Sequence, residues 1–347
     1  MTSFAAPEVD FVLEHGADPA LLGIQPSTTA GLQRLGRCLA VLGANAPRPQ
    51  EVKLVITADF VKSVSDRLPP AQRGLYDISR GAGTVGAKTM MVRDDVHVLV
   101  PALLCLDADV AQARSAPKHA KEIADIVQLR TGMLYRLVTH EAQHVAMYQN
   151  GEDDPIIRDA REGRRNLLVA AHQVMTEYRA ELGVPAQMNA PTSEWSPIED
   201  LEVLRDGLRR VACVEYQSHL NVGKLAHDVL YQASNLWKAF AYQAAMCRVE
   251  GVAIGEPVSL DVLKTDEWKR MADAHWVDFQ EALSDAPTGT TEWDERARED
   301  LTDEVANVLD QWLDTLGFSW SDGPAGSRFD ILSWDLLDDD DDDDDDE

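Results

Sequence analysis

Two histidines and a glutamate occur together in the stretch His140-Glu141-Ala142-Gln143-His144. On an α-helix, His140 and His144 lie one turn apart and project to the same side, so both imidazole rings can bind one metal ion. A catalytic zinc site uses three protein ligands and leaves one coordination position open for water. Glu141 lies beside the histidines, where its carboxylate can accept a proton from that water. The stretch therefore predicts a zinc site equipped with a general base.

The helix that carries this motif is amphipathic. At 100° per residue, the two histidines and the glutamate share a face with six apolar or aromatic residues, Met133, Leu134, Leu137, Val138, Val145 and Tyr148. The opposite face carries Arg136, Thr139 and Gln143. Ionisable side chains on a buried face must bind a metal or find hydrogen-bond partners. A metal site is the favoured interpretation, and a hydrogen-bond network in the core is the alternative.

The third metal ligand has two candidates further along the chain, Glu177 and Glu215. Glu177 shares a helix face with small and apolar residues, which would let another helix approach closely. Glu181 follows one turn later, where an acid can accept the second N–H of a ligand histidine and orient its ring. Glu215 lies on the apolar stripe of the next predicted helix and precedes His219 by one turn. We favour Glu177 as the third ligand and keep Glu215 as the alternative.

His219 is the candidate for stabilising negative charge during catalysis. When water attacks a carbonyl group an oxyanion forms, and a hydrogen-bond donor placed near it lowers the barrier. A single histidine on an apolar face is also typical of a residue that is hydrogen-bonded within the core. We take Glu141 as the catalytic base and His219 as the candidate oxyanion donor. Weaker candidates for the second role are Tyr148, Tyr178 and Tyr216.

Strands are predicted only in the first third of the chain. Residues 52–57 have the alternating apolar pattern of a strand, and a short helix is expected near residues 60–68. The runs 87–92 and 96–100 are rich in β-branched residues and are separated by three polar ones, which predicts a hairpin. The glycine-rich stretch 81–86 is followed neither by a phosphate-binding motif nor directly by a helix, so we reject a nucleotide site there.

Helices are predicted for most of the remaining chain. A helix near residues 28–42 is interpreted as a packing appendage at the N-terminus. The helix with the metal motif is predicted from Pro117 to Asn150, with Gly132 as a point where it could kink or divide. Later helices are predicted at residues 154–182, 198–222, 224–249, 259–283 and 292–316. The fold class is therefore α+β and predominantly α-helical, with a small sheet before the long metal helix and a helical bundle after it.

The metal motif and the acidic motif that follows it resemble those of the gluzincin branch of the zincin metallopeptidases. The resemblance rests on the segment from His140 to His144 (HEAQH) and on the segment from Glu177 to Glu181 (EYRAE), about thirty residues downstream. It implies a zincin-like fold, peptidase activity, and an extended peptide that adds to a strand such as residues 96–100. Nothing after His144 matches the longer metzincin motif HExxHxxGxxH. The second motif that is usual in gluzincins, NExxSD, is absent as well.

The resemblance covers residues 51–222 and gives the chain four predicted regions. These are an N-terminal helical appendage (1–50), a zincin-like catalytic core (51–222), a C-terminal helical region (223–337) and a disordered acidic tail (338–347). The tail carries ten of the net −28 charges, and the remaining −18 still disfavours nucleic acid or an anionic membrane as a partner.

The chain has the features of a cytoplasmic protein. No apolar segment is long enough to span a bilayer, and residues 1–16 lack the basic start and apolar run of a signal peptide. The four cysteines are scattered without metal-binding spacing, which is typical of reduced thiols: Cys38, Cys105, Cys213 and Cys247.

Three functions are compatible with these features. The leading hypothesis is a zinc-dependent hydrolase, most simply a metallopeptidase that acts on a peptide or protein substrate. A non-haem iron oxygenase is the first alternative, because two histidines and one carboxylate also form the ligand set for Fe²⁺. The second alternative is a non-enzymatic helical protein that works through partner binding. The sequence leaves the oligomeric state open.

Overall fold

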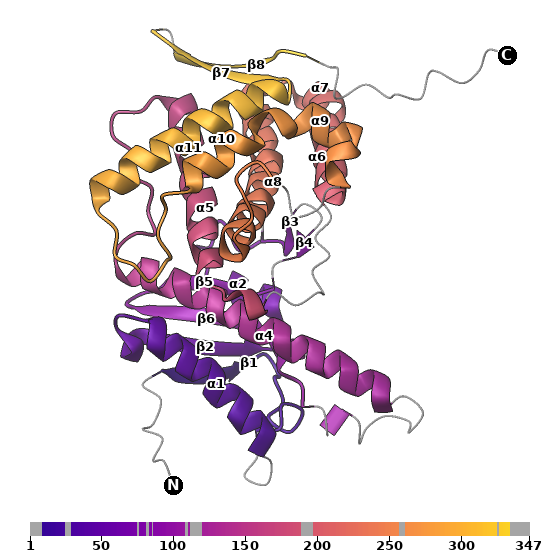
Figure 1. Ribbon diagram of the computed structural model, residues 1–347, viewed down its shortest axis with the longest axis vertical. Coiled ribbons are helices and arrows are strands. Elements are labelled where there is room, and N and C mark those ends of the chain that lie inside the picture. The colour runs from indigo at the N-terminus through magenta and orange to yellow at the C-terminus, as the bar shows by residue number, and fades with distance from the viewer. Residues whose placement is uncertain are drawn as a thin grey trace, which may run out of the picture.

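The computed structural model describes residues 9–24, 29–74, 76–80, 83–84, 86–107, 110–111, 120–188, 197–256, 261–324 and 326–333. These residues form a half built around a sheet and a half built from helices, with the long helix α4 (Ala120–Gln149) lying where the two meet (Figure 1). The predicted fold class, α+β and predominantly helical, is confirmed. No helix in the described part of the chain combines the length and the hydrophobicity needed to cross a bilayer.

The main sheet has four strands in the order β1-β2-β6-β5. β1 (Asp10–Glu14), β2 (Val52–Thr57) and β6 (Asp95–Pro101) are parallel, and β5 (Lys88–Val92) runs antiparallel to β6. The predicted hairpin is thus confirmed, whereas β1 was missed. β6, the strand on which the gluzincin resemblance places a bound peptide, is an interior strand with both edges paired. The strand next to it at the edge is β5.

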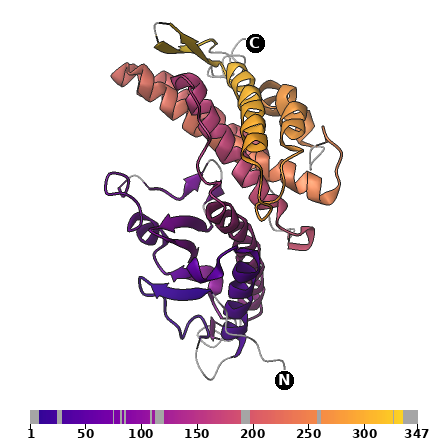
Figure 2. The ribbon, with the colours of Figure 1, turned by 90° about the vertical axis from the view of Figure 1, so that its left-hand side faces the viewer.

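Helices cover both faces of this sheet. α1 (Thr29–Asn45) and α4 lie side by side on one face (Figure 2), and their apolar side chains pack with those of β2 and β6, including Leu39, Leu54 and Val98. The shorter α2 (Phe60–Ser65) packs on the other face through Val64. Because β1 pairs with β2 and α1 contributes to the sheet core, this N-terminal segment is integral to the fold and is not the appendage that the sequence suggested.

The helical half surrounds a second core. Its central helices are α5 (Glu162–Leu182), α8 (Val222–Glu250) and α11 (Glu295–Thr315), flanked by α6 (Pro197–Arg209), α9 (Asp266–Met271) and α10 (Asp273–Leu283). Four buried tryptophans pack in this core, Trp237, Trp268, Trp276 and Trp312. A hairpin of β7 (Phe318–Gly323) and β8 (Gly326–Ile331) packs against it. The boundary predicted at residue 222, between the catalytic core and the C-terminal helical region, falls inside this second core, because residues on both sides of it pack together there.

Three predicted helices have different limits in the structure. The helix expected from residue 154 begins at Glu162. The helix expected over 198–222 is interrupted by a π-helix (Arg210–Glu215) and ends with α7 (Tyr216–His219), because Leu220 adopts a left-handed conformation with φ of 51°. The helix expected over 259–283 divides at Ala272, whereas α4 continues through Gly132 without a break.

The remaining elements are short. β3 (Ser79–Arg80) pairs with β4 (Gly83–Thr84) next to the glycine-rich stretch. Single 3₁₀ turns are formed by Pro49–Glu51, Ala102–Cys105, Ala186–Met188 and Val262–Lys264. The predicted helix start at Pro117 and the acidic tail 338–347 lie outside the described residues.

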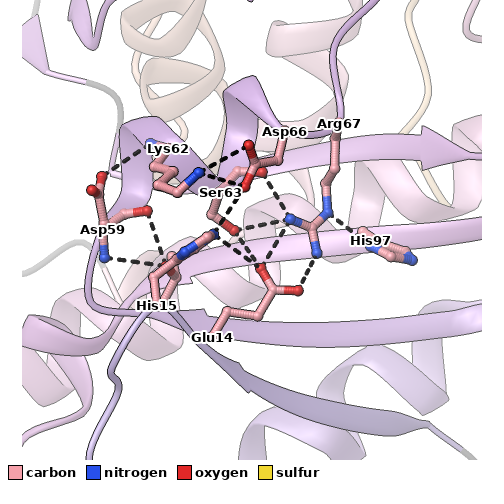
Figure 3. Close-up of polar contacts among 9 residues, drawn as sticks. Glu14, His15, Asp59, Lys62, Ser63, Asp66, Arg67 and His97 are labelled. Carbon is pink, nitrogen blue, oxygen red and sulfur yellow. Dashed lines mark hydrogen bonds and ion pairs between the residues drawn. The ribbon is translucent and has the colours of Figure 1, made fainter.

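A polar cluster around Arg67 fastens the segment after α2 to the sheet (Figure 3). The Arg67 guanidinium donates to both carboxylate oxygens of Glu14, at 2.6 and 3.0 Å, and its Nε donates to Nδ1 of His97 at 3.0 Å. Ser63 Oγ donates to the same Glu14 carboxylate at 2.8 Å. The Arg67 hydrogen bond holds the pKa of Glu14 below its usual value. This Arg67 cluster is closed, because each of these acceptors has a donor within the cluster.

Candidate metal centre

Two neighbouring helices bring three potential ligands together. The Nε2 atoms of His140 and His144 in α4 lie 3.2 Å apart. Oε2 of Glu177 in α5 lies 3.3 Å from the first nitrogen and 3.4 Å from the second. Within the described residues, this is the one group of three or more such side chains close enough to hold a metal ion. A buried His-His-Glu group that can hold a metal is therefore present.

The C-terminal end of α5 lies close to α4. At Gly183, the residue that follows α5, a Cβ atom would lie 2.1 Å from Cδ of Gln143 in α4. A larger residue there would force the Gln143 side chain to move. Gln143 itself is only 2% exposed, although the helical wheel placed it on the polar face. Its Oε1 accepts a hydrogen bond from the backbone N–H of Thr290 at 3.1 Å, so the loop between α10 and α11 packs behind the metal motif.

Arg179 joins the same loop to the C-terminal end of α4. Its side chain is fully buried, pairs with Glu152 and donates to the backbone carbonyls of Pro287 and Thr291. The backbone N–H of Gly289 donates back to the Arg179 carbonyl at 3.2 Å. Arg179 thus ties α5 both to Glu152, just after α4, and to the loop between α10 and α11. Glu177 lies two residues earlier on the same helix.

Glu181 contacts the outer nitrogen of a candidate ligand. Its Oε2 lies 3.1 Å from Nδ1 of His140, while its other oxygen accepts from Arg136. The carboxylate is 2% exposed, so these two contacts account for its burial. An Nδ1–H of His140 that donates to Glu181 leaves Nε2 free to face His144 and Glu177. This is the geometry that the sequence suggested for an outer partner of a ligand histidine.

Glu141 is oriented by a residue of the edge strand. Thr89 of β5 donates from Oγ1 to Oε2 of Glu141 at 2.7 Å, and both side chains are buried. Glu141 is therefore held on the sheet side of α4, beside the two histidines but not part of the three-residue group. Sequence reasoning missed Thr89, because nothing local marks a threonine that contacts a residue 52 positions later.

Tyr242 is the second residue that sequence reasoning missed. It comes from α8, and its hydroxyl donates to Oε2 of Glu177 at 2.6 Å. Its ring lies edge-on to the His140 ring with 5.6 Å between the centroids. No motif surrounds Tyr242, and α8 carries a second tyrosine, Tyr231, so nothing in the sequence distinguished Tyr242.

Glu215 and His219 lie away from the His-His-Glu group. Glu215 forms ion pairs with Arg210 and Lys224, at 3.3 and 3.8 Å. His219 accepts a hydrogen bond from the backbone N–H of Asn221 and packs against Tyr216. Both belong to the segment between α6 and α8, at the end of the helical half away from α4 (Figure 1). The structure therefore places the alternative ligand and the expected oxyanion donor outside the His-His-Glu group, because the segment that carries them packs against α8.

The ionisable side chains of the group shift one another's pKa values. Burial by itself lowers the pKa of His140, but hydrogen bonds and charge from Glu177 and Glu181 outweigh it and raise the value to about 10. Burial opposes ionisation of Glu177, yet the two histidines hold its pKa well below the usual value. The Tyr242 hydroxyl stays protonated, because burial and the Glu177 carboxylate raise its pKa well above 10.

No family model, curated protein or solved structure matches this chain. The resemblance to the gluzincin peptidases therefore rests on the two short motifs alone.

Proposed function

We propose that this chain is a zinc-dependent hydrolase that cleaves peptide bonds. The observation that carries the proposal is the spacing of the three facing atoms, between 3.2 and 3.4 Å. Ligands on a tetrahedral ion with bonds of 2.0 to 2.1 Å are separated by about 3.3 Å. Two histidines and one carboxylate also form the ligand set of Fe²⁺ sites, so metal analysis is the measurement that separates zinc from the iron alternative.

His140, His144 and Glu177 would hold the ion. When bound, zinc would supply Lewis acidity and lower the pKa of a water molecule to about 7. Glu181 keeps the His140 ring turned so that Nε2 faces inward, and Arg136 keeps Glu181 in place. The donor set is the one that zinc uses in hydrolytic sites.

The proton transfers fall to Glu141. Its carboxylate would take a proton from the attacking water and give it to the leaving amine. The Thr89 hydroxyl positions this carboxylate through the 2.7 Å hydrogen bond. Tyr242 would take the role first assigned to His219, because its hydroxyl contacts Glu177 at the edge of the group and could donate to the oxyanion that forms at the attacked carbonyl.

Metal analysis combined with one substitution tests this function. Protein purified without chelators should contain one zinc ion per chain by mass spectrometry and should cleave an unfolded polypeptide such as carboxymethylated lactalbumin. Glu141→Gln should keep the zinc and lower kcat about 10²- to 10⁴-fold, because the base is not a ligand. Glu215→Gln is the matched control, since it makes the same change outside the group and should leave turnover intact.

Three results would contradict the proposal. Stoichiometric iron with oxygen consumption would favour the oxygenase. Protein that takes up no transition metal would remove the hydrolytic mechanism altogether. A Glu141→Gln variant as active as the wild type would remove the assigned base.

A further inference from the structure

The main sheet ends at β1, and no strand among the described residues pairs with the outer side of β1. The strand order β1-β2-β6-β5 places β1 at the end of the sheet farthest from the helical half (Figure 1). Each of its five residues is exposed or partly exposed. An edge of this kind presents backbone donors and acceptors with which another extended chain can pair.

The direction of the backbone groups shows what the outer edge of β1 offers. The carbonyl of Glu14 accepts from the backbone N–H of Ala58, which follows β2, at 3.3 Å, so this carbonyl points toward the sheet. The backbone groups of successive residues in a strand point alternately to its two sides. Phe11 and Leu13 therefore direct their N–H and C=O groups outward. These two donors and two acceptors have the spacing that an added strand uses.

Exposed apolar side chains flank the edge on both faces of the sheet. Phe11 pairs in register with Leu54, on the face covered by α1 and α4, and is 40% exposed. Val12 pairs with Val55, on the face covered by α2, and is 39% exposed. A strand added to the edge has neighbours on both faces and would cover part of each side chain. The edge therefore suits an extended chain.

The charges around β1 select the kind of chain. Segment 59–67 meets the end of β1, where Arg67 binds Glu14 (Figure 3). Together with residues 10–18, this segment carries five acids but only two lysine or arginine residues. The acids are Asp10, Glu14, Asp18, Asp59 and Asp66, and the bases are Lys62 and Arg67.

This acid excess disfavours a second copy of the chain as the occupant. Two copies paired antiparallel about Val12 would place Asp10 of one opposite Glu14 of the other, and the net charge of −28 on each chain adds repulsion. A segment with lysine or arginine at its ends would be attracted to the same edge.

We propose that the outer edge of β1 binds an extended segment of a partner protein as an added strand, and that this segment has an apolar centre and basic ends. The site is separate from the metal centre. The strand that contacts the metal helix through Thr89 and Glu141 is β5, at the opposite end of the sheet. The proposal therefore holds or fails independently of the proposed function.

Fluorescence anisotropy with the full chain tests the binding. The probe is a fluorescein-labelled ten-residue peptide with two lysines at each end and alternating valine and threonine between them. The background is Glu141→Gln, so that the proposed peptidase does not consume the probe. Phe11→Pro should weaken binding about tenfold or more, because proline removes an outward N–H and its ring blocks the edge. Phe11→Val keeps the N–H and a strand-forming side chain, and this control should bind within about threefold of the parent.

Two measurements without a substitution in β1 decide the question even if Phe11→Pro fails to fold. Hydrogen exchange followed by NMR should show the amides of Phe11 and Leu13 slowed about tenfold or more by the peptide, with Val12, whose N–H faces β2, unchanged. A peptide with glutamates in place of the lysines should bind about tenfold more weakly or worse.

Each other outcome overturns the proposal. A folded Phe11→Pro variant that binds the peptide like its parent, or unchanged exchange at Phe11 and Leu13, places the peptide elsewhere. Equal binding of the lysine and glutamate peptides removes the selection by charge. A wild-type dimer that Phe11→Pro makes monomeric identifies a second copy as the occupant. Slow exchange at Phe11 and Leu13 in the free chain, made fast by deletion of residues 1–8, identifies the N-terminal segment as the occupant.

Discussion

The metal centre and the Arg67 cluster are both groups of polar side chains held by several elements, yet they differ in their balance of donors and acceptors. In the Arg67 cluster, one guanidinium donates to Glu14 and His97, and Ser63 adds a further donor. In the metal centre, two ring nitrogens and a carboxylate oxygen face one another. The first cluster is satisfied by its own groups, whereas the second could hold a cation from outside.

This difference distinguishes a closed hydrogen-bond network from a group of side chains that could bind a metal ion. A carboxylate that accepts from an arginine and a serine has no lone pairs aimed at empty space. A carboxylate aimed at two imidazole nitrogens must share a proton or bind a metal, and the raised pKa of His140, about 10, reflects that requirement. The same reasoning gives four tests.

The largest effect is expected when the carboxylate of the metal centre is removed. Glu177→Ala should weaken zinc binding by about three orders of magnitude or more, because it leaves two ligands. Glu215→Ala should change the affinity less than about twofold, since Glu215 pairs with Arg210 and Lys224 outside the group. Competition with a chromophoric chelator measures both. The reverse order would transfer the ligand role to Glu215.

Breaking the Arg67 cluster should affect stability and leave the metal alone. Arg67→Met leaves Glu14 without its main partner in a site where the Arg67 side chain is 10% and the Glu14 side chain 24% exposed. We expect the free energy of unfolding to fall by about 2 to 3 kcal/mol, measured with urea, with zinc affinity unchanged. Lys62→Met is the control, because it breaks a half-exposed pair with Asp66 and should cost under about 0.5 kcal/mol. Loss of zinc in Arg67→Met would show that the two clusters are coupled.

A buried histidine without a carboxylate beside it should behave in the opposite way to His140. Nε2 of His172 donates to the backbone carbonyl of Asp153, and burial lowers the pKa of His172 to about 4. The unfolded chain takes up a proton at His172 near pH 6.5, so it binds more protons than the folded chain between about pH 6.5 and 4. Stability should therefore fall as the pH is lowered through this window.

The size of this effect can be isolated by comparing two proteins. By pH 5 the His172 contribution should be about 2 kcal/mol, and His172→Gln should lose that part of the pH dependence. Urea unfolding at pH 7 and pH 5 gives the difference. If the free energy of unfolding depends on pH in the same way in the wild type and in His172→Gln, His172 is protonated in the folded state.

The smallest of the four effects concerns the partner of His140. Glu181→Gln removes the charge that holds the His140 ring but keeps an oxygen within reach of Nδ1. We expect zinc affinity to fall about tenfold, the lower end of what outer contacts contribute to a metal site. Glu162→Gln, an exposed acid on the same helix, is the control and should leave the affinity unchanged. An unchanged affinity in Glu181→Gln would assign the contact to packing alone.

Much of the site could be predicted from the sequence because it is encoded over short distances. His140, Glu141 and His144 lie within one helical turn or slightly more, so their common face follows from the helix itself. The same holds for the spacing of Glu177 and Glu181. The interior strands β2 and β6 could be predicted for a related reason, since the alternating pattern of residues 52–57 and the apolar run 96–100 are encoded within each strand.

The tertiary structure decided everything that depends on contacts between distant parts of the chain. It selected Glu177 over Glu215, because α5 packs against α4, whereas the π-helix that carries Glu215 packs against α8, and Glu215 pairs there with Arg210 and Lys224. It supplied Thr89 and Tyr242, which lie 52 and 65 positions from the residues they contact. Helical and strand periodicities report only which face of its own element a residue occupies, and they carry no information about which faces of different elements meet.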